Sequence, residues 1–203
     1  MPLDALLARP GLDPGTRLLV AAAVAIWRGD WARLEACVAA AQRLSRPRSE
    51  LEEVLLQAVL FCGFPRVVTA FERLAAAWPS AAPPGGGALP VAEQKPAGDA
   101  LFGRIYGKNE AAVRRMLRDY HQELHDFVLD AAYGRILSRP GLTAKAREII
   151  AVGLLAAQDQ VRQFVGHARG ALHLGATPEE LCEALVTTFG DTDEVDPWRA
   201  RLR

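Results

Sequence analysis

The spacing of apolar residues is helical along almost the whole chain. Ala, Leu and Arg dominate, β-branched residues are sparse, and apolar positions recur every three or four residues rather than every second one. This pattern predicts an all-α protein. The expected helices cover residues 16–28, 30–44, 49–61, 65–77, 109–118, 120–137, 144–157, 159–173 and 178–189.

Length and charge restrict the class of protein. The chain has 203 residues, half of them apolar, and 24 basic and 24 acidic side chains give a formal net charge of zero. These values are typical of a soluble globular chain of one domain or two small ones. Since no excess of Lys and Arg attracts nucleic acid or an anionic bilayer, we expect neither as a partner. Anionic small-molecule substrates stay possible, because 21 of the basic residues are Arg.

The cysteines and the N-terminal segment favour a cytoplasmic protein. Cys37, Cys62 and Cys182 form no CxxC pair, and an odd number argues against a secreted disulfide framework. The first fifteen residues contain Asp4 and, after Pro2, two further prolines at positions 10 and 14. They lack the apolar centre of a signal peptide. Charged residues interrupt each apolar run, so no membrane span is expected.

A Pro- and Gly-rich segment divides the chain. We expect a first helical repeat over 1–78, a linker without helix over 79–99, and a second helical repeat with lead-in helices over 100–203. A plain connector is favoured over an active-site lid for the linker.

The two parts also resemble each other. A shift of 130 residues places the RPGL that starts at Arg9 on the RPGL that starts at Arg139. Ala- and Leu-rich helices align by chance somewhere, but a four-residue identity before each helix pair favours an internal duplication. The same shift brings two further sets of residues into register, Arg17 with Arg147 and Glu53 with Glu183.

The second half contains the candidate site. Residues 147–157 are apolar on nearly every side, which indicates a buried helix, and Glu148 lies in its first turn. Such an acid can simply complement the helix dipole. In the following helix Gln160, Gln163 and His167 share one flank beside an apolar stripe. By itself a lone His167 is more often a solvated or core residue than a catalyst.

The stretch RPGLTAKAREIIAVGLLAAQDQVRQFVGHARGALHLGATPEEL resembles the carboxymuconolactone decarboxylase family. The matching features are RPGL, the Arg-Glu that opens a buried helix, a His nineteen residues after that Glu, and the closing Gly-x-Thr-x-Glu-Glu. The resemblance implies the all-helical fold of the alkyl hydroperoxidase D-like proteins. It also implies a homo-oligomer, typically a ring of subunits.

The chain departs from the peroxidase-type members of that fold. Those members have Glu, then Cys-x-x-Cys, then His, and Gln160 and Gln163 stand at the two cysteine positions here. An amide can neither attack a disulfide nor leave from one, so thiol-dependent peroxide reduction at this site is excluded. The decarboxylase-type branch is the closer resemblance. The equivalents in the first half include Leu18 and Cys37, so that half is expected to be structural.

The resemblance implies decarboxylation of a small carboxylated compound, either a lactone or an aromatic-derived acid. His167 would then donate a proton, and Glu148 would orient the imidazole and favour its charged form. Arginines would bind the substrate carboxylate and glutamines would donate to the carbonyl oxygen. These candidates are Arg147, Arg162, Arg169, Gln160 and Gln163. No metal or organic cofactor is expected.

Other residues and functions are weaker candidates. His121 and His125 have the spacing of a metal pair without further ligands nearby, so surface positions are expected. Cys62 is expected to be a buried, inert thiol. Two alternative functions stay open: a non-catalytic oligomeric or ligand-binding member of the same fold, and a peroxidase-like protein that uses cysteines elsewhere.

Overall fold

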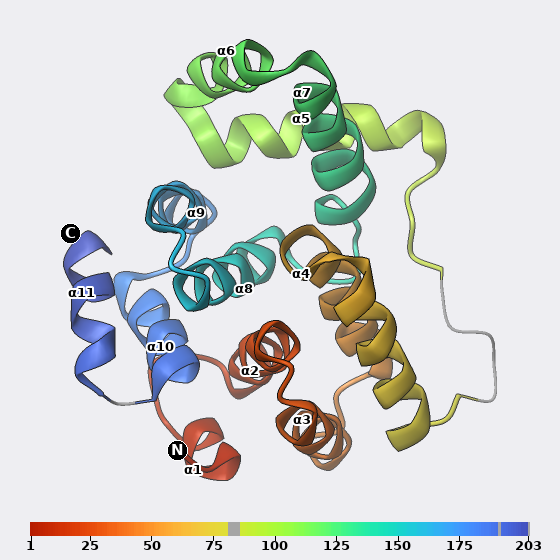
Figure 1. The fold of residues 1–203 in the computed structure, drawn as a ribbon, viewed down its shortest axis with the longest axis vertical. Coiled ribbons are helices and arrows are strands. Elements are labelled where there is room, and N and C mark those ends of the chain that lie inside the picture. The colour runs from red at the N-terminus through yellow and green to blue at the C-terminus, as the bar shows by residue number, and fades with distance from the viewer. Residues whose placement is uncertain (81–85, 191, 203) are drawn as a thin grey trace.

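The computed structural model describes residues 1–80, 86–190 and 192–202, and these residues contain helices and no strand. The all-α prediction is confirmed (Figure 1). The α-helices are α1 Leu3–Leu7, α2 Pro14–Arg28, α3 Trp31–Arg43, α4 Arg48–Ala77, α5 Val91–Tyr106, α6 Glu110–Tyr120, α7 Gln122–Phe127, α8 Ala144–Ala157, α9 Val161–His173, α10 Pro178–Phe189 and α11 Asp196–Arg199. A π-helix, η2, covers Val128–Leu137, and three-residue 3-10 helices cover Gly107–Asn109, Asp193–Val195 and Ala200–Leu202.

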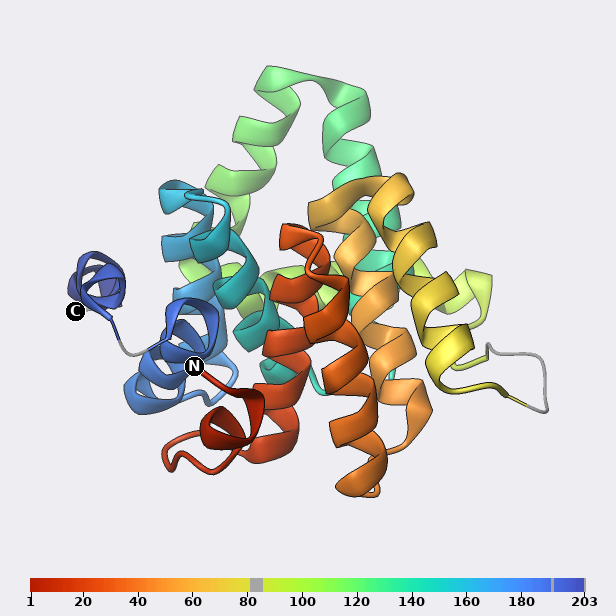
Figure 2. The same ribbon diagram turned by 60° about the horizontal axis from the view of Figure 1, so that its bottom comes forward.

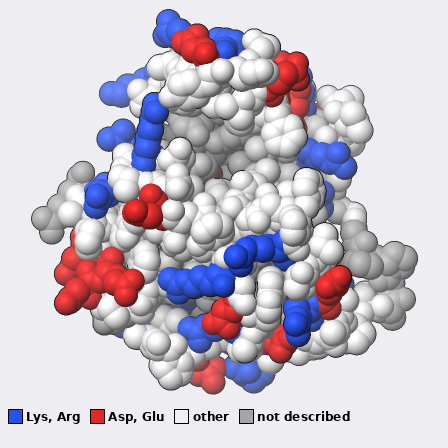
Figure 3. Space-filling model, viewed as in Figure 1, with Lys and Arg blue, Asp and Glu red and all other residues white. Residues whose placement is uncertain are grey.

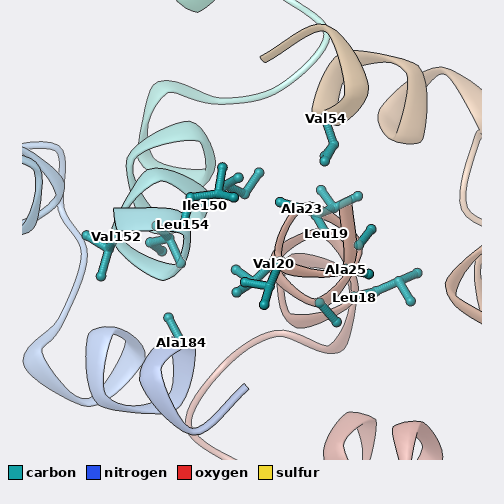
Figure 4. Packing of buried hydrophobic residues seen from close by; sticks show 14 of the residues in the cluster. Leu18, Leu19, Val20, Ala23, Ala25, Val54, Ile150, Val152, Leu154 and Ala184 are labelled. Atoms are coloured by element: carbon teal, nitrogen blue, oxygen red, sulfur yellow. The ribbon is translucent and has the colours of Figure 1, made fainter. Parts of the chain in front are cut away.

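Helices α2 and α8 lie side by side at the centre of the main core (Figures 1 and 4). Helix α4 covers α2 on one side, and α10 packs against both central helices. The two helices approach closely because Gly153 faces Val20: a Cβ at Gly153 would lie 2.8 Å from Cγ1 of Val20. Aliphatic residues large and small, such as Leu19, Ile150 and Ala23, fill the rest of this part of the core (Figure 4).

The two halves have helices with matching starts. Helices α2, α3 and α4 begin at Pro14, Trp31 and Arg48, and α8, α9 and α10 each begin 130 residues later. The caps also correspond, since the side chain of Asp13 accepts from the backbone of α2 and that of Thr143 accepts from the backbone of α8. The internal duplication stays a prediction, and these matching starts favour it.

Helices α5, α6, α7 and η2 form an arm that covers α8 and α9 from one end (Figures 1 and 2). This arm has a small core of its own around Phe102, Ile105 and Tyr133. Helix α5 crosses η2 where Gly98 meets Gly134, and a Cβ at Gly98 would lie 2.6 Å from Cα of Gly134. The arm therefore depends on two glycines that let the backbones touch.

The expected linker 79–99 is partly wrong, because α5 begins at Val91. Pro90 precedes the first turn of α5, where a missing N–H does no harm, and Pro96 lies on the exposed side of the helix. Gly98, which weakens a helix by itself, is needed for the contact with η2. Packing thus overrides the local preference of this segment. Positions 81–85 of the expected linker lie outside the described residues.

Helix α4 is broken in the middle. Gly63 has φ 74° and ψ 166°, and Pro65 follows, so the two helices predicted over 49–61 and 65–77 are joined by a kink. An 18-residue window of α4 is nevertheless apolar enough, by composition and length alone, to span a membrane. Arg66 still interrupts the apolar stretch between Glu53 and Glu72, as expected, although α4 passes the test of length and composition. Core helices pass the same test, and buried residues such as Leu55 and Leu74 lie on both sides of the kink.

Candidate active site

Glu148 and His167 meet between two successive helices. Glu148 lies in the first turns of α8 and His167 in the middle of α9, and the tight turn at Asp159, with φ 56°, folds α9 back along α8. Nδ1 of His167 lies 2.9 Å from Oε2 of Glu148. The carboxylate side chain is 2% exposed and the imidazole 14% exposed, so the pair is buried with one edge of the ring accessible.

The carboxylate determines the charge of the imidazole. Burial is the largest influence on His167 and would lower its pKa, but the charge and hydrogen bond of Glu148 together outweigh burial and raise the pKa above the ordinary value. Because the carboxylate accepts, Nδ1 carries a proton and donates to Glu148. Nε2 makes no hydrogen bond to any described residue. It is therefore the atom that can exchange a proton with a ligand.

A glycine and a pair of tyrosines lie around the carboxylate of Glu148. Gly170 leaves room for it, because a Cβ there would lie 2.8 Å from Oε2 of Glu148 and 2.6 Å from Cγ2 of Ile105. Tyr133 and Tyr106 share a hydrogen bond of 3.1 Å between their hydroxyl groups. Burial first, then the neighbouring Tyr106 and the charge of Glu148, raise the pKa of Tyr133, so its hydroxyl stays protonated.

The site opens into a cleft of about 1070 Å³ between α9 and the arm. Figure 3 shows the surface hollowed below the α6–α7 end of the molecule. One wall comes from α9 and includes His167. The facing wall comes from α6, α7 and η2 and is apolar, and Ile105 and Tyr106 from α5 also line the cleft. The residues of the facing wall are Ala112, Val113, Met116, Leu117, Tyr120, Leu124 and Val128.

The ionisable groups on the α9 wall are all potential cations. Arg162, Arg169, His167 and His173 line the cleft, and among the described residues no Asp or Glu does so. Arg162 contacts the arm, with a hydrogen bond of 3.2 Å from Nη1 to the hydroxyl of Tyr120. Three of the predicted site residues beside the Glu148–His167 pair, namely Gln163, Arg162 and Arg169, therefore lie in the same cleft.

Gln160 and Arg147 do not line this cleft. Gln160 is exposed and bonds to the backbone oxygen of Gln158. Arg147 is buried on another side of α8, and Nη2 lies 2.6 Å from Oε2 of Glu53. The expectation that Arg147 binds substrate is corrected, because its guanidinium is already paired inside the core. The sequence placed Arg147 next to Glu148, but adjacent helix residues point in different directions.

The partners of Arg147 recur in the other half of the chain. Glu53 accepts from Arg139 and Arg147. Glu183 pairs in the same way with Arg9 and Arg17, and all three residues lie 130 positions from their equivalents. Each acid is thus held by arginines from the opposite half. Burial acts first to raise the pKa of Glu53 and of Glu183, but the arginines outweigh it and the pKa of each is lowered.

In the first half, the positions equivalent to Glu148 and His167 are buried and apolar. They are Leu18 and Cys37, which belong to the main core, and burial raises the pKa of Cys37 to about 12. Cys62, expected to be buried, is only partly buried, but burial is still enough to raise its pKa to about 11. No group of three or more His, Cys, Asp or Glu side chains within 1–80, 86–190 and 192–202 is arranged to hold a metal ion.

The two other histidines of interest differ from each other. His121 is exposed and caps α7 by accepting from the backbone N–H of Glu123. The expected surface position of His125 is wrong: the residue is buried, and its Nδ1 lies 2.8 Å from Oδ1 of Asp126. His125 belongs to α7, which packs against α6 and η2, and the spacing of the two histidines cannot reveal this packing.

Sequence reasoning missed two groups of site residues. Tyr106 lines the cleft, and the buried Tyr133 donates to its hydroxyl. The apolar wall of α6 was also missed. A signal existed, because α6 carries Val113, Met116 and Leu117 on one face of an otherwise charged helix.

Comparisons with known proteins agree with this architecture. The model of the carboxymuconolactone decarboxylase family matches residues 3–76 and 122–188, which include Glu148, His167 and most of both halves. The all-helical, alkyl hydroperoxidase D-like fold that the sequence predicted is the fold of this family.

Three named proteins are similar to parts of this chain. Peroxisomal protein 2 of Schizosaccharomyces pombe is 28% identical over 138 residues, covering 66% of this chain and 65% of that protein. The 4-carboxymuconolactone decarboxylase of Acinetobacter baylyi is 30% identical over 70 residues, covering 34% and 52% of the two chains. Nitrosuccinic acid decarboxylase npaB of Metarhizium robertsii is 33% identical over 61 residues, covering 30% and 43%.

Each match reaches less than two thirds of the relative's own length. The family model, in contrast, matches well over half of this chain in two segments. The chain therefore belongs to the carboxymuconolactone decarboxylase family.

Proposed function

We propose that this protein is a decarboxylase of small carboxylated carbonyl compounds. One observation carries the proposal: the Glu148–His167 pair opens onto a cleft that, among the described residues, is lined by two arginines and two histidines and by no Asp or Glu. Two of the relatives have names that describe decarboxylases, which supports the same class of reaction.

The reaction needs one proton and one place for an electron pair. The bond between the carboxylate carbon and its neighbour breaks, carbon dioxide leaves, and the bonding electrons move into the adjacent carbonyl group as an enolate. His167 then gives the proton on Nε2 to the carbon that lost the carboxylate. Glu148 stabilises the imidazolium before the transfer and fixes its orientation throughout.

The cleft supplies the remaining roles. Arg162 and Arg169 attract and orient the anionic substrate, a task that guanidinium groups perform with two parallel hydrogen bonds. The amide of Gln163 can donate to the carbonyl oxygen as negative charge develops on it. Gln160 and Arg147 have no part in this proposal, because neither lines the cleft.

Replacing His167→Ala tests the proposal. Carbon dioxide release would be measured on a panel of 3-oxo acids and carboxylated lactones with the unchanged protein and with the variant. We expect the variant to lose about 10²- to 10⁴-fold in kcat, the usual contribution of a positioned acid. His121→Asn is the matched control, because Asn also caps a helix and His121 lies outside the cleft. Turnover that survives in the His167 variant would remove the proposed acid.

A second candidate function is ligand binding without turnover. Peroxisomal protein 2, which matches 138 residues of this chain, has a name that states no reaction. If no compound of the panel is turned over but several bind in the cleft, this candidate replaces the first. A peroxidase-like role is disfavoured, because the thiols of Cys37 and Cys62 have raised pKa values and glutamines stand at the redox positions.

Three further expectations stay predictions. The two halves are proposed to be copies of one ancestral unit, which the matching helix starts and the exchanged ion pairs support. Assembly into a homo-oligomer and a place in the cytoplasm are proposed on the family resemblance and on the cysteine pattern respectively.

A further inference from the structure

The shape of the cleft points to a narrower class of ligand than a carboxylated compound in general. This inference rests on the proposed function for the location of the site, but it is tested by binding alone. The starting observation is that the two walls differ: α9 presents arginine, histidine and glutamine beside Val161 and Val165, whereas the arm presents mostly aliphatic side chains together with two tyrosines.

The apolar wall lacks a cover. None of the residues of α6 is buried, although Val113, Met116 and Leu117 share a face toward the cleft. Leu124 is 43% exposed in the same wall. A row of aliphatic side chains in contact with water is unfavourable, and such rows usually mark the place of an apolar partner or ligand.

The opposite wall fixes the charge of that ligand. Arg162 and Arg169 lie on one face of α9, seven residues apart, or about 10 Å along the helix. Among the described residues, Arg169 has no ion pair and no hydrogen bond, and no Asp or Glu lines the cleft. A carboxylate is the complementary group, and a guanidinium without a partner can bind it in the forked geometry.

The volume argues against a compact polyacid. The volume of about 1070 Å³ is slightly above the roughly 300–1,000 Å³ that is usual for small-molecule sites. A small lactone bearing several carboxylates would fill only the basic side and leave the wall of α6 wet. We propose that the cleft binds a carboxylic acid whose carboxylate contacts the arginines of α9 and whose extended alkyl or aryl body covers the apolar wall of α6, α7 and η2.

Binding of straight-chain monocarboxylates provides the first test. Butanoate, hexanoate, octanoate and decanoate would be titrated calorimetrically into the full chain, together with succinate and 1-decanol. We expect Kd to fall by up to about fourfold for each added methylene, the factor that burial of one such group gives. Succinate should bind more weakly than decanoate, and 1-decanol should lose at least tenfold because it lacks the carboxylate.

Two variants test the two walls separately. Leu117→Asn should flatten the dependence on chain length, and Arg169→Gln should weaken every carboxylate about equally without changing that dependence. The matched controls are Ala111→Asn on the outer face of α6 and Arg118→Gln near its end, both exposed and outside the cleft. Neither control should alter the titrations. Circular dichroism would confirm that all four variants are folded.

Three results would overturn the inference. One is tighter binding of succinate than of decanoate, and another is a Kd that does not depend on chain length. The third is a dimer, seen by sedimentation, that Leu117→Asn dissociates, together with no binding of any acid. That result would show that a second copy of the chain covers the apolar wall. Failure of the proposed function looks different: decanoate would bind as expected, but no compound of the panel would release carbon dioxide.

Discussion

Nδ1 of His167 lies 2.9 Å from Oε2 of Glu148, although the two residues are 19 positions apart and belong to different helices. The carboxylate is almost wholly buried, so its negative charge acts mainly on the imidazole beside it. One ring nitrogen is thereby committed to the protein and the other is left for chemistry. Several consequences of this pairing and of its surroundings can be measured.

Glu148→Gln should lower the pKa of His167. The amide oxygen can still accept from Nδ1, but it has no charge, so burial then outweighs the remaining hydrogen bond. Since the charge of Glu148 keeps the imidazole protonated to higher pH, its removal should shift the loss of activity at high pH toward lower pH. Titration of the imidazole by NMR would measure the shift directly. Glu35→Gln, an exposed acid far along the chain, should leave the titration unchanged.

Gly170→Ala should disturb the site and Gly166→Ala should not destabilise the fold. The two glycines lie on the same helix, but a Cβ at Gly170 would lie 2.8 Å from Oε2 of Glu148, whereas one at Gly166 meets no atom within 4 Å. Relieving the contact at Gly170 moves the carboxylate or Ile105, at a cost of about 1–3 kcal/mol. The change at Gly166 should stabilise by about 0.4–1 kcal/mol.

Urea unfolding of both variants would measure these two effects. A Gly170→Ala protein as stable as the parent would show that the site relaxes without resistance at this position.

Glu53→Gln should destabilise the protein strongly. The substitution leaves Arg147, which is 1% exposed, without the charge that balances it, and loss of one partner in such a pair costs about 3–5 kcal/mol. Glu183→Gln, its equivalent, should cost less because the Glu183 side chain is 13% exposed. Denaturant titration of the two variants would rank them, and equal losses would contradict the expected effect of burial.

The same two acids predict how stability depends on pH. Because the arginines lower the pKa of Glu53 and of Glu183, the stability these groups contribute is complete above the ordinary pKa of a carboxyl group, about 4.3. It is then lost as pH falls through the lowered values. Thermal unfolding between pH 7 and pH 2 should therefore show a steep decrease below about pH 4 that is reduced in the double Gln variant.

The thiols should be unreactive in the folded protein. With the pKa of Cys62 raised to about 11 and that of Cys37 to about 12, almost no thiolate exists near neutral pH at either position. We expect slow modification of both by a disulfide reagent until urea is added, and no disulfide after dilute peroxide. Mass spectrometry of the labelled peptides would locate the sites. Rapid oxidation of Cys62 would revive the peroxidase-like alternative.

Much of this fold could be predicted from the sequence, because apolar stripes and capping residues are local patterns that identify helices. The break near Gly63 and the starts of α8, α9 and α10 were predicted within a few residues. Helix α5 was not, because its Pro and Gly residues oppose helix locally and are compensated only by the contact between Gly98 and Gly134. That contact joins segments far apart in sequence, so no local pattern encodes it.

The candidate site was predictable where its residues lie in one helical hairpin, and it was not predictable where they come from distant segments. The spacing within the α8–α9 hairpin identified the acid and the imidazole, whose meeting the structure describes. Arg147 was misassigned because a sequence does not say toward which neighbour a buried guanidinium points, and Glu53 lies 94 residues away. Tyr106 and the wall of α6 come from the arm, whose position over α9 depends on tertiary packing alone.

The ion pairs that join an arginine of one half to a glutamate of the other make the two halves dependent on each other. Arg17 is 0% exposed and Arg147 is 1% exposed, and each is neutralised by a glutamate contributed from across the chain. A fragment ending before residue 79, made alone, would have to bury or hydrate a guanidinium that has lost its counter-ion, and so would the complementary fragment. The halves should consequently be insoluble apart yet reassemble when refolded together, because the half that contains the Glu148–His167 pair depends on the other half for its stability.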